Sequence, residues 1–410
     1  EATRVYGSLS ARGGAGGGNG GFIETSGGHL DARPASVRAD APAGAAGQWL
    51  LDPNDILITD DANTVDMTAG PSFTSLDDSA VISSSTIEAA LNDGNNVVVT
   101  TGHGGANSQP GDITVRSANI RVASKRRVSL TLAAERDIVV QNSSIIGAAG
   151  EQEVDLDVTL NAATGGGGGG RIRILDSSIQ TGGALTMRAP AMEFAGEGGF
   201  TAYVGGPIQL FTGSLANSAS ADFSSSASGT AILAAGFDGA SNIAQLSGTP
   251  ISLGAPNGRW LLYVQDDSLP VLGMPYAFLQ YGSTYPKTAL GSGDGIVFAQ
   301  PAVLTLRSAQ SPSKTYDATT SVPALPPASL SVAGLRPGQQ LGTPLQAPTL
   351  AFVQPDVGSG IATTIGVFDP AVHDGQGRPV FGYTFESAIT GDITPRPLTL
   401  SAVVAADKVY

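Results

Sequence analysis

The chain repeats short segments of alternating apolar and polar residues at a nearly constant spacing. Equivalent apolar positions recur after 25 residues from Ile113 to Ile138, after 28 from Leu132 to Leu160, and after 27 from Leu160 to Met187. Alternation with a period of two buries one face of a strand. A recurrence close to one solenoid coil stacks the buried faces of successive strands. The spacing therefore predicts an all-β fold, with a right-handed parallel β-helix over residues 1–300.

Six apolar side chains are predicted to point into this β-helix. They are Ile113, Leu132, Ile138, Leu160, Ile172 and Met187. If the coils stack at strand spacing, about a dozen of them would form a rod on the order of 55 Å long. A β-sandwich would also contain many short strands, but it explains less readily the variable insertions between them, such as the glycine run at 165–170. Such insertions fit loops at one corner of a coil.

One helix is expected to interrupt the strands. The segment STIE matches a capping box, in which the side chains of Ser85 and Glu88 each bond the backbone of the other residue. The helix should end at Gly94. Ile87 and Leu91 lie four positions apart, so they should share the helix face that packs against the flank of the β-helix.

Aromatic residues concentrate after a weakly patterned stretch. Alternation is poor between 190 and 255, and aromatics gather between 258 and 298. They either cap the open end of the solenoid, in a junction over about 256–300, or form a surface on which sugars stack. The candidate carbohydrate-binding residues are Tyr276, Tyr281 and Tyr285, because a stretch rich in Gly and Pro brings side chains to solvent. Trp260 is assigned to the core.

A second, longer repeat begins after residue 300. The tripeptide LTL at 304–306 returns at 398–400, and a Lys-x-Tyr motif at 314–316 returns at 408–410, so both recur after 94 residues. Two motifs with one shared period indicate a tandem module. The chain then holds one whole copy and the start of another, and we expect it to be a piece of a longer array.

The whole copy is predicted to be a small all-β module at 303–397, followed by the truncated start of the next copy at 398–410. Its expected strands lie at 304–306, 330–332, 350–353, 361–365 and 383–385.

Composition limits the function classes. The net charge of −14 argues against a nucleic-acid partner, because binding phosphates requires clustered cations. The single basic run, at 125–127, is interpreted as a solvated turn. No stretch approaches 18 uninterrupted apolar residues, so we expect no membrane insertion. The chain contains no cysteine, which removes disulfides and Cys-based metal sites from consideration.

Two metal or nucleotide patterns are weak. Asp52, Asp55, Asp60 and Asp61 are candidate Ca²⁺ ligands by their density, but the EF-hand pattern fails, and Asp is also common in turns. The glycine run at 13–21 contains a GxGxxG match. A strand follows it in place of the helix that a pyrophosphate site needs. We expect neither a cofactor nor a nucleotide.

No catalytic set can be assembled from the sequence. A glycan-cleaving β-helix would need paired carboxylates across a groove. Asp155, Asp157 and Asp176 lie on strands or near coil corners, but nothing in the sequence pairs them. The three histidines are scattered. We therefore predict no enzyme, and a glycan lyase or hydrolase on the same fold stays an alternative.

Several segments, taken in order, resemble the filamentous-haemagglutinin-like adhesins that Gram-negative bacteria secrete by the two-partner route. They are GGFIETSG at 20–27, WLLDP at 49–53, STI at 85–87, LNDGNNV at 91–97, GDITV at 111–115 and GRWLLY at 258–263. The motifs KTYDATT at 314–320, GYTF at 382–385 and ITPRPLT at 393–399 are similar to the YDG repeat of these proteins, with Ala318 where that repeat usually has Gly.

This resemblance implies a secreted or surface-exposed adhesin that acts in attachment or biofilm cohesion, with polysaccharide or a cell-surface glycan as ligand. It also implies an outer-membrane transporter as partner, which would act on an amino-terminal secretion domain outside this segment. A second alternative from the same resemblance is the stalk of a contact-dependent toxin.

Overall fold

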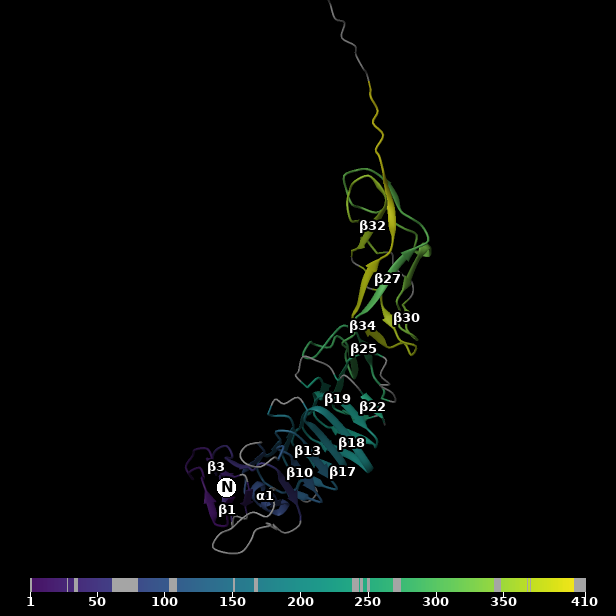
Figure 1. Cartoon of the computed structure of the whole chain (residues 1–410). Coiled ribbons are helices and arrows are strands. Elements are labelled where there is room, and N and C mark those ends of the chain that lie inside the picture. Colours follow the sequence, from purple (N-terminus) through teal and green to yellow (C-terminus); the bar gives the residue numbers. More distant parts are fainter. Residues whose placement is uncertain are drawn as a thin grey trace, which may run out of the picture. The chain divides into compact units, whose positions relative to one another are not determined.

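The structure of the chain is a computed structural model. It describes residues 2–27, 29–32, 36–60, 80–102, 109–149, 152–165, 169–237, 243, 246–248, 251–267, 274–342, 348–366, 368 and 370–401. The described part is mostly β, and parallel strands dominate it (Figure 1). None of its helices is long and apolar enough to cross a membrane. The chain divides into two compact units, Glu1–Ala277 with Ser283–Gln300, and Phe278–Gly282 with Pro301–Tyr410.

Most strands of the first unit are parallel and stack in three ladders, which we number in the order in which a coil visits them. Ladder 1 contains β3 (Phe22–Ser26), β6 (Gln48–Asp52), β9 (Asn96–Thr100), β12 (Val128–Ala133), β16 (Leu156–Asn161), the start of β18 (Leu185–Val204), the start of β19 (Ile208–Asn217), β21 (Gly229–Ala235), β24 (Gly258–Val264) and β26 (Gly295–Phe298).

Ladders 2 and 3 alternate with it along the chain. Ladder 2 contains β8 (Ala80–Ser83), β7 (Ile56–Thr59), β10 (Ile113–Arg116), β13 (Ile138–Gln141), the start of β17 (Arg171–Thr181), parts of β18 and β19, and β22 (Leu246–Gly248). Ladder 3 contains β11 (Asn119–Val122), β14 (Ser144–Ala149), the ends of β17 and β18, β20 (Ala221–Ser225) and β23 (Ile251–Gly254). This is a β-helix-like parallel structure.

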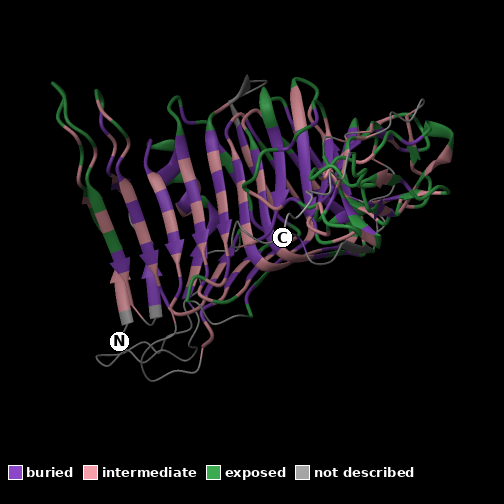
Figure 2. Cartoon of the chain, turned by 90° about the horizontal axis from the view of Figure 1, so that it is seen from above, coloured by how far each residue is buried: buried purple, intermediate pink, exposed green. Residues whose placement is uncertain are grey.

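The core lies between the ladders, and the predicted register is confirmed. Ile113 pairs with Ile138, and Leu160 lies between Leu132 and Met187 in one row. All six side chains predicted to point inward are at most 1% exposed. Buried and partly exposed residues alternate along the strands, as Figure 2 shows. The recurring positions singled out in the sequence lie in ladders 1 and 2, whereas the described coils from β9 to β23 also contain a strand of ladder 3. The sequence does not mark this strand, because it follows the strand of ladder 2 after a corner too short to be recognised as a turn.

The described residues of the stretch at 190–255 form regular strands, contrary to expectation. Strands of all three ladders continue through it, and Phe194, Phe200 and Phe223 form a buried ring cluster with centroids 5.4 to 5.5 Å apart. The alternation was hard to recognise in the sequence because small residues occupy many strand positions where the prediction looked for β-branched ones. Trp260 is buried, as predicted.

Helix α1 (Ser84–Asn92) has the predicted packing but not the predicted cap. Ile87 and Leu91 are fully buried. The N-cap is Ser83, whose hydroxyl accepts from the backbone of Ser85, so the capping box is wrong. Glu88 has a different role, which is described next.

Glu88 belongs to a set of side chains that cover the open edge of β11. Its carboxylate accepts the backbone N–H of Arg121, the Asn92 amide accepts that of Ala123, and Asp60 accepts that of Asn119. An edge strand with unpaired backbone groups invites further strand pairing. The helix and Asp60 therefore close the first rung of ladder 3.

The second unit contains small sheets around two apolar clusters. Strand β27 (Ala302–Ser308) pairs with β29 (Leu330–Ala333) and β35 (Tyr383–Ser387), and β32 (Gly358–Ile365) pairs with β31 (Leu350–Phe352) and β36 (Thr390–Thr394). All five predicted strands of the module are present. Leu306 and Phe352 lie in separate clusters.

The two copies of the LTL motif differ in environment. Leu304 and Leu306 are buried in β27, whereas Leu398 and Leu400 are 94% and 88% exposed. The returning Lys-x-Tyr motif at 408–410 lies outside the described residues. The start of the next copy is therefore described only up to residue 401.

Candidate groove at the corner of ladders 2 and 3

The corner between ladders 2 and 3 repeats the same backbone conformation in three successive coils. Ser117, Asn142 and Asp176 have φ values of 49°, 49° and 48°. These values lie in the left-handed region, which Asn and Asp adopt more readily than most residues because their short side chains bond locally. The backbone N–H of Asn142 donates to Leu175 in the next coil (3.0 Å). One such residue turns the chain from ladder 2 into ladder 3.

The residue after each corner points inward and is small. Ala118, Ser143 and Ser177 occupy this position and are buried. The hydroxyl of Ser143 accepts from the backbone N–H of Ala118 at 3.1 Å, and that of Ser177 accepts from Ser143 at 3.2 Å. The two hydroxyls donate to Gln141 and Leu175. This column satisfies backbone groups that the turn leaves without a ladder partner.

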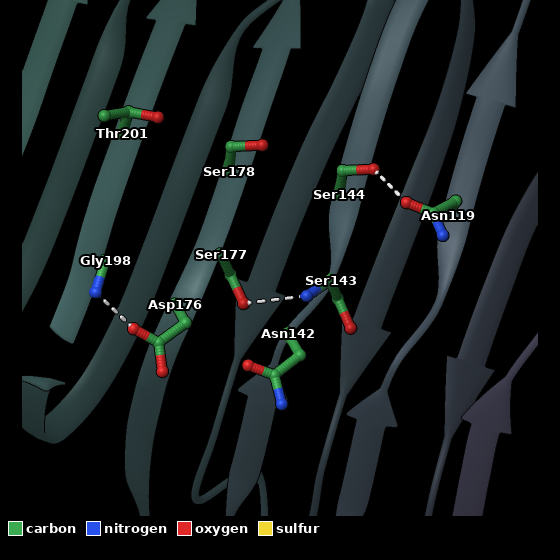
Figure 3. A pocket seen from close by; sticks show the side chains of 9 residues that line it. All are labelled: Asn119, Asn142, Ser143, Ser144, Asp176, Ser177, Ser178, Gly198 and Thr201. Atoms are coloured by element: carbon green, nitrogen blue, oxygen red, sulfur yellow. Dashed lines mark hydrogen bonds between the residues drawn. The ribbon is translucent and has the colours of Figure 1, made fainter. Parts of the chain in front are cut away.

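The next residue points outward, and a row of these residues lines a shallow groove. Asn119, Ser144, Ser178 and Thr201 are direct neighbours in the register of ladder 3. With the corner residues they border an open cavity of about 370 Å³. Figure 3 shows this row on adjacent strands, with Asp176 and Asn142 below it. The complete lining is Asn119, Asn142, Ser143, Ser144, Asp176, Ser177, Ser178, Gly198 and Thr201.

Part of this polar lining is already bonded. The Ser144 hydroxyl donates to the Asn119 carbonyl oxygen at 2.7 Å, and Asp176 accepts the N–H of Gly198 at 2.6 Å. No dashed line joins the side chains of Ser178, Thr201 and Asn142 to the other lining residues drawn in Figure 3. They are therefore available to water or to a hydroxyl-rich ligand.

The groove contains a single carboxylate among its lining residues, that of Asp176. Asp157, the second sequence candidate for acid chemistry, forms a two-point ion pair with Arg127, both contacts being 2.7 Å. Asp155 does not line the groove. Glycoside hydrolysis uses two carboxylates on either side of the bond. Of the three candidate carboxylates, the structure thus places Asp176 in the groove and neither Asp155 nor Asp157.

The basic run at 125–127 is at the surface, but it is not simply solvated. Arg127 pairs with Asp157, and Arg126 donates to the backbone carbonyls of Ala41 and Pro42.

The candidate Ca²⁺ ligands are occupied by protein donors. Asp52 accepts from the Thr100 hydroxyl at 2.8 Å, and Asp55 accepts the backbone N–H groups of Gly111 and Asp112, both at 2.7 Å. Burial raises the pKa of Asp55, although these backbone bonds oppose the shift. Asp61 lies outside the described residues.

Asp60, the remaining candidate Ca²⁺ ligand, covers the open edge of β11 by accepting the backbone N–H of Asn119. Burial alone would raise its pKa, but the hydrogen bonds from Ser84 and Asn119 outweigh that effect and hold the pKa below its ordinary value. No group of three potential metal ligands occurs among the described residues.

The three candidate tyrosines do not share one environment. Tyr281 is only 3% exposed, and its hydroxyl accepts a hydrogen bond from Gln339 at 3.0 Å. The expectation that it reaches solvent is wrong, because its ring is packed on Tyr383 at 5.4 Å. Tyr285 is half-buried against Phe211 and Tyr263. Tyr276 is half-buried as well, and the ligand roles of Tyr276 and Tyr285 stay predictions.

Sequence reasoning missed the groove, although a signal was present. The pentapeptides RSANI at 116–120, QNSSI at 141–145 and LDSSI at 175–179 share one pattern, a left-handed corner residue, a small residue, a polar residue and Ile. Comparison with protein-family models gave no match, and comparison with curated proteins gave no significant match.

Proposed function

We propose that this chain is an internal segment of a filamentous-haemagglutinin-like adhesin, exported through an outer-membrane transporter and secreted or held at the bacterial surface. Its first unit would be a right-handed parallel β-helix that serves as a stalk, and its second a YDG-type repeat module. The segment would contribute to attachment or biofilm cohesion by binding polysaccharide.

The observation that carries the proposal is the open polar groove over successive coils. Stacked coils repeat equivalent side chains along one line, and a ligand that extends along that line meets the same chemistry at each rung. This geometry suits a polymer better than a small molecule, for which enclosed pockets are usual. The hydroxyl and amide groups of Ser178, Thr201 and Asn142, which make no hydrogen bond within the described lining, match the hydroxyls of a sugar.

The turn at 314–321 supports the repeat-module part of the proposal. Ala318 has φ 62°, and it stands where the YDG repeat usually has Gly, the residue best suited to the left-handed region. The ammonium group of Lys314 bonds the carbonyl and hydroxyl of Thr319 at 2.9 and 2.7 Å and pairs with Asp317. The hydrogen bond from Lys314 to the carboxylate of Asp317 lowers the pKa of Asp317 to about 2.

The proposal is tested by retention. The purified chain would be immobilised on beads, and neutral and acidic matrix polysaccharides would be passed over them, with beads that carry an unrelated protein of similar net charge as control. We expect selective retention of polysaccharide, and no shortening of an oligosaccharide during incubation. Retention equal to the control, or cleavage of the oligosaccharide, would contradict the proposal.

A further inference from the structure

The outward face of ladder 3 continues beyond the groove. Residues two apart on a strand point to the same side, so Tyr203 lies on the same face as Thr201. In the register, Tyr203 has Gln180 on one side and Ser224 on the other. Tyr203 is 51% exposed.

We call this surface the ladder 3 face and define it by six outward residues on three adjacent rungs. They are Ser178, Gln180, Thr201, Tyr203, Asp222 and Ser224.

The chemistry of this face fits a sugar. An exposed tyrosine ring offers a rigid apolar platform with a polar tip, and the Gln180 amide beside it can both donate and accept. Hydroxyls and one carboxylate complete the set. Asp222 lies on the face itself and Asp176 lines the adjoining groove, while Arg121 lies two rungs from Gln180 in the same row. Carboxylates repel a polyanion, so a neutral ligand is favoured.

The spacing of the face also fits a linear glycan. Adjacent strands lie about 4.8 Å apart, which is close to the length of one hexopyranose unit in an extended chain. A polysaccharide that crosses the strands would therefore present one sugar per rung. We propose that the ladder 3 face binds a neutral, linear, β-linked polysaccharide lying across the strands, with the ring of Tyr203 stacked on one sugar. This inference rests on the proposed function and names the site and the ligand class.

The experiment compares ligand affinity between variants of the whole chain. Calorimetric titration would use a hexamer of β-1,4-linked glucose as probe, and a β-1,4-linked polyuronate hexamer as its charged counterpart. We expect Tyr203→Ala to raise the Kd for the glucose hexamer on the order of tenfold or more. Tyr203→Phe, which keeps the ring, should stay within about twofold. Gln180→Ala should weaken binding as well, because one amide contact is lost.

The matched control is Tyr316→Ala, which removes another tyrosine at the surface, 36% exposed, in the second unit. It should leave the Kd unchanged. Circular dichroism and thermal unfolding would verify that each variant keeps its fold, and binding should not weaken at 0.5 M salt because the ligand is neutral.

Each outcome decides something different. If the wild-type chain binds the glucose hexamer and Tyr203→Ala binds it equally well, the ladder 3 face is not the site, and the proposed function stands. A preference for the polyuronate, lost in salt, would overturn the neutral ligand. If wild type neither binds the hexamer nor retains any matrix polysaccharide in the bead assay, both the inference and the proposed function fail.

Discussion

Ala318 holds a backbone conformation that its side chain disfavours. Its φ of 62° places it in the left-handed region, where an L side chain costs about 1 kcal/mol and Gly costs less. We predict that Ala318→Gly raises the free energy of unfolding of the second unit by about 0.5 kcal/mol or more. Urea titration followed by circular dichroism measures this. A matched Ala333→Gly change, in β29, should destabilise, and a loss of stability in both variants would contradict the argument.

Asp40 makes the stability of the first unit depend on pH in the acidic range. Its carboxylate accepts from Arg12 and Arg38, both at 2.9 Å. The hydrogen bond from Arg38 lowers its pKa to about 2. Because the folded pKa is below the unfolded one, the pair stabilises the fold above about pH 4, and the gain is lost as the pH falls toward 2. We expect about 1 kcal/mol, since both arginines are well exposed to solvent.

The measurement is urea unfolding at pH 6 and pH 3. Asp40→Asn should lower the stability at pH 6 and remove part of the decrease that the wild type shows between the two values. If the stability of the wild type and of Asp40→Asn decreased equally between pH 6 and pH 3, Asp40 would not contribute to the pH dependence. Asp222→Asn is a suitable control at another carboxylate of the first unit.

At the scale of a strand, the face of the sheet on which a residue lies determines how much stability is lost when a charged side chain is introduced there. Leu160 is fully buried in β16, and Thr159 next to it faces outward. A buried carboxylate without a partner costs several kcal/mol. We predict that Leu160→Asp destabilises the first unit by that amount and Thr159→Asp by about 0.5 kcal/mol or less.

Hydrogen exchange would locate the damage. In a stack whose rungs contact only their neighbours, protection should fall in β12, β16 and β18 and persist in distant rungs. Loss of protection throughout the unit would indicate that the stack unfolds as one cooperative body.

The sequence reveals the elements that depend on local periodicity and hides those that depend on neighbours. The rows through Ile113 and Leu160 were predictable because alternation and coil spacing are both written in the chain. The ladder 3 strands were missed because a single left-handed residue, such as Asn142, separates them from ladder 2. Glu88 was assigned to a helix cap since the strand edge it covers is 33 residues away. Tyr281 was expected at the surface because no local pattern reports its packing on Tyr383.

At the scale of the whole molecule, two units with separate cores should unfold separately. The first unit is stabilised by stacked rungs and the second by clusters around Leu306 and Phe352. We predict at least two calorimetric transitions. Leu306→Ala leaves a cavity in the second unit and should lower one transition on the order of 10 °C, without moving the other. Leu160→Asp should do the reverse. If one transition accounts for the whole heat and both variants shift it, the two units form a single cooperative structure and cannot be treated as independent parts.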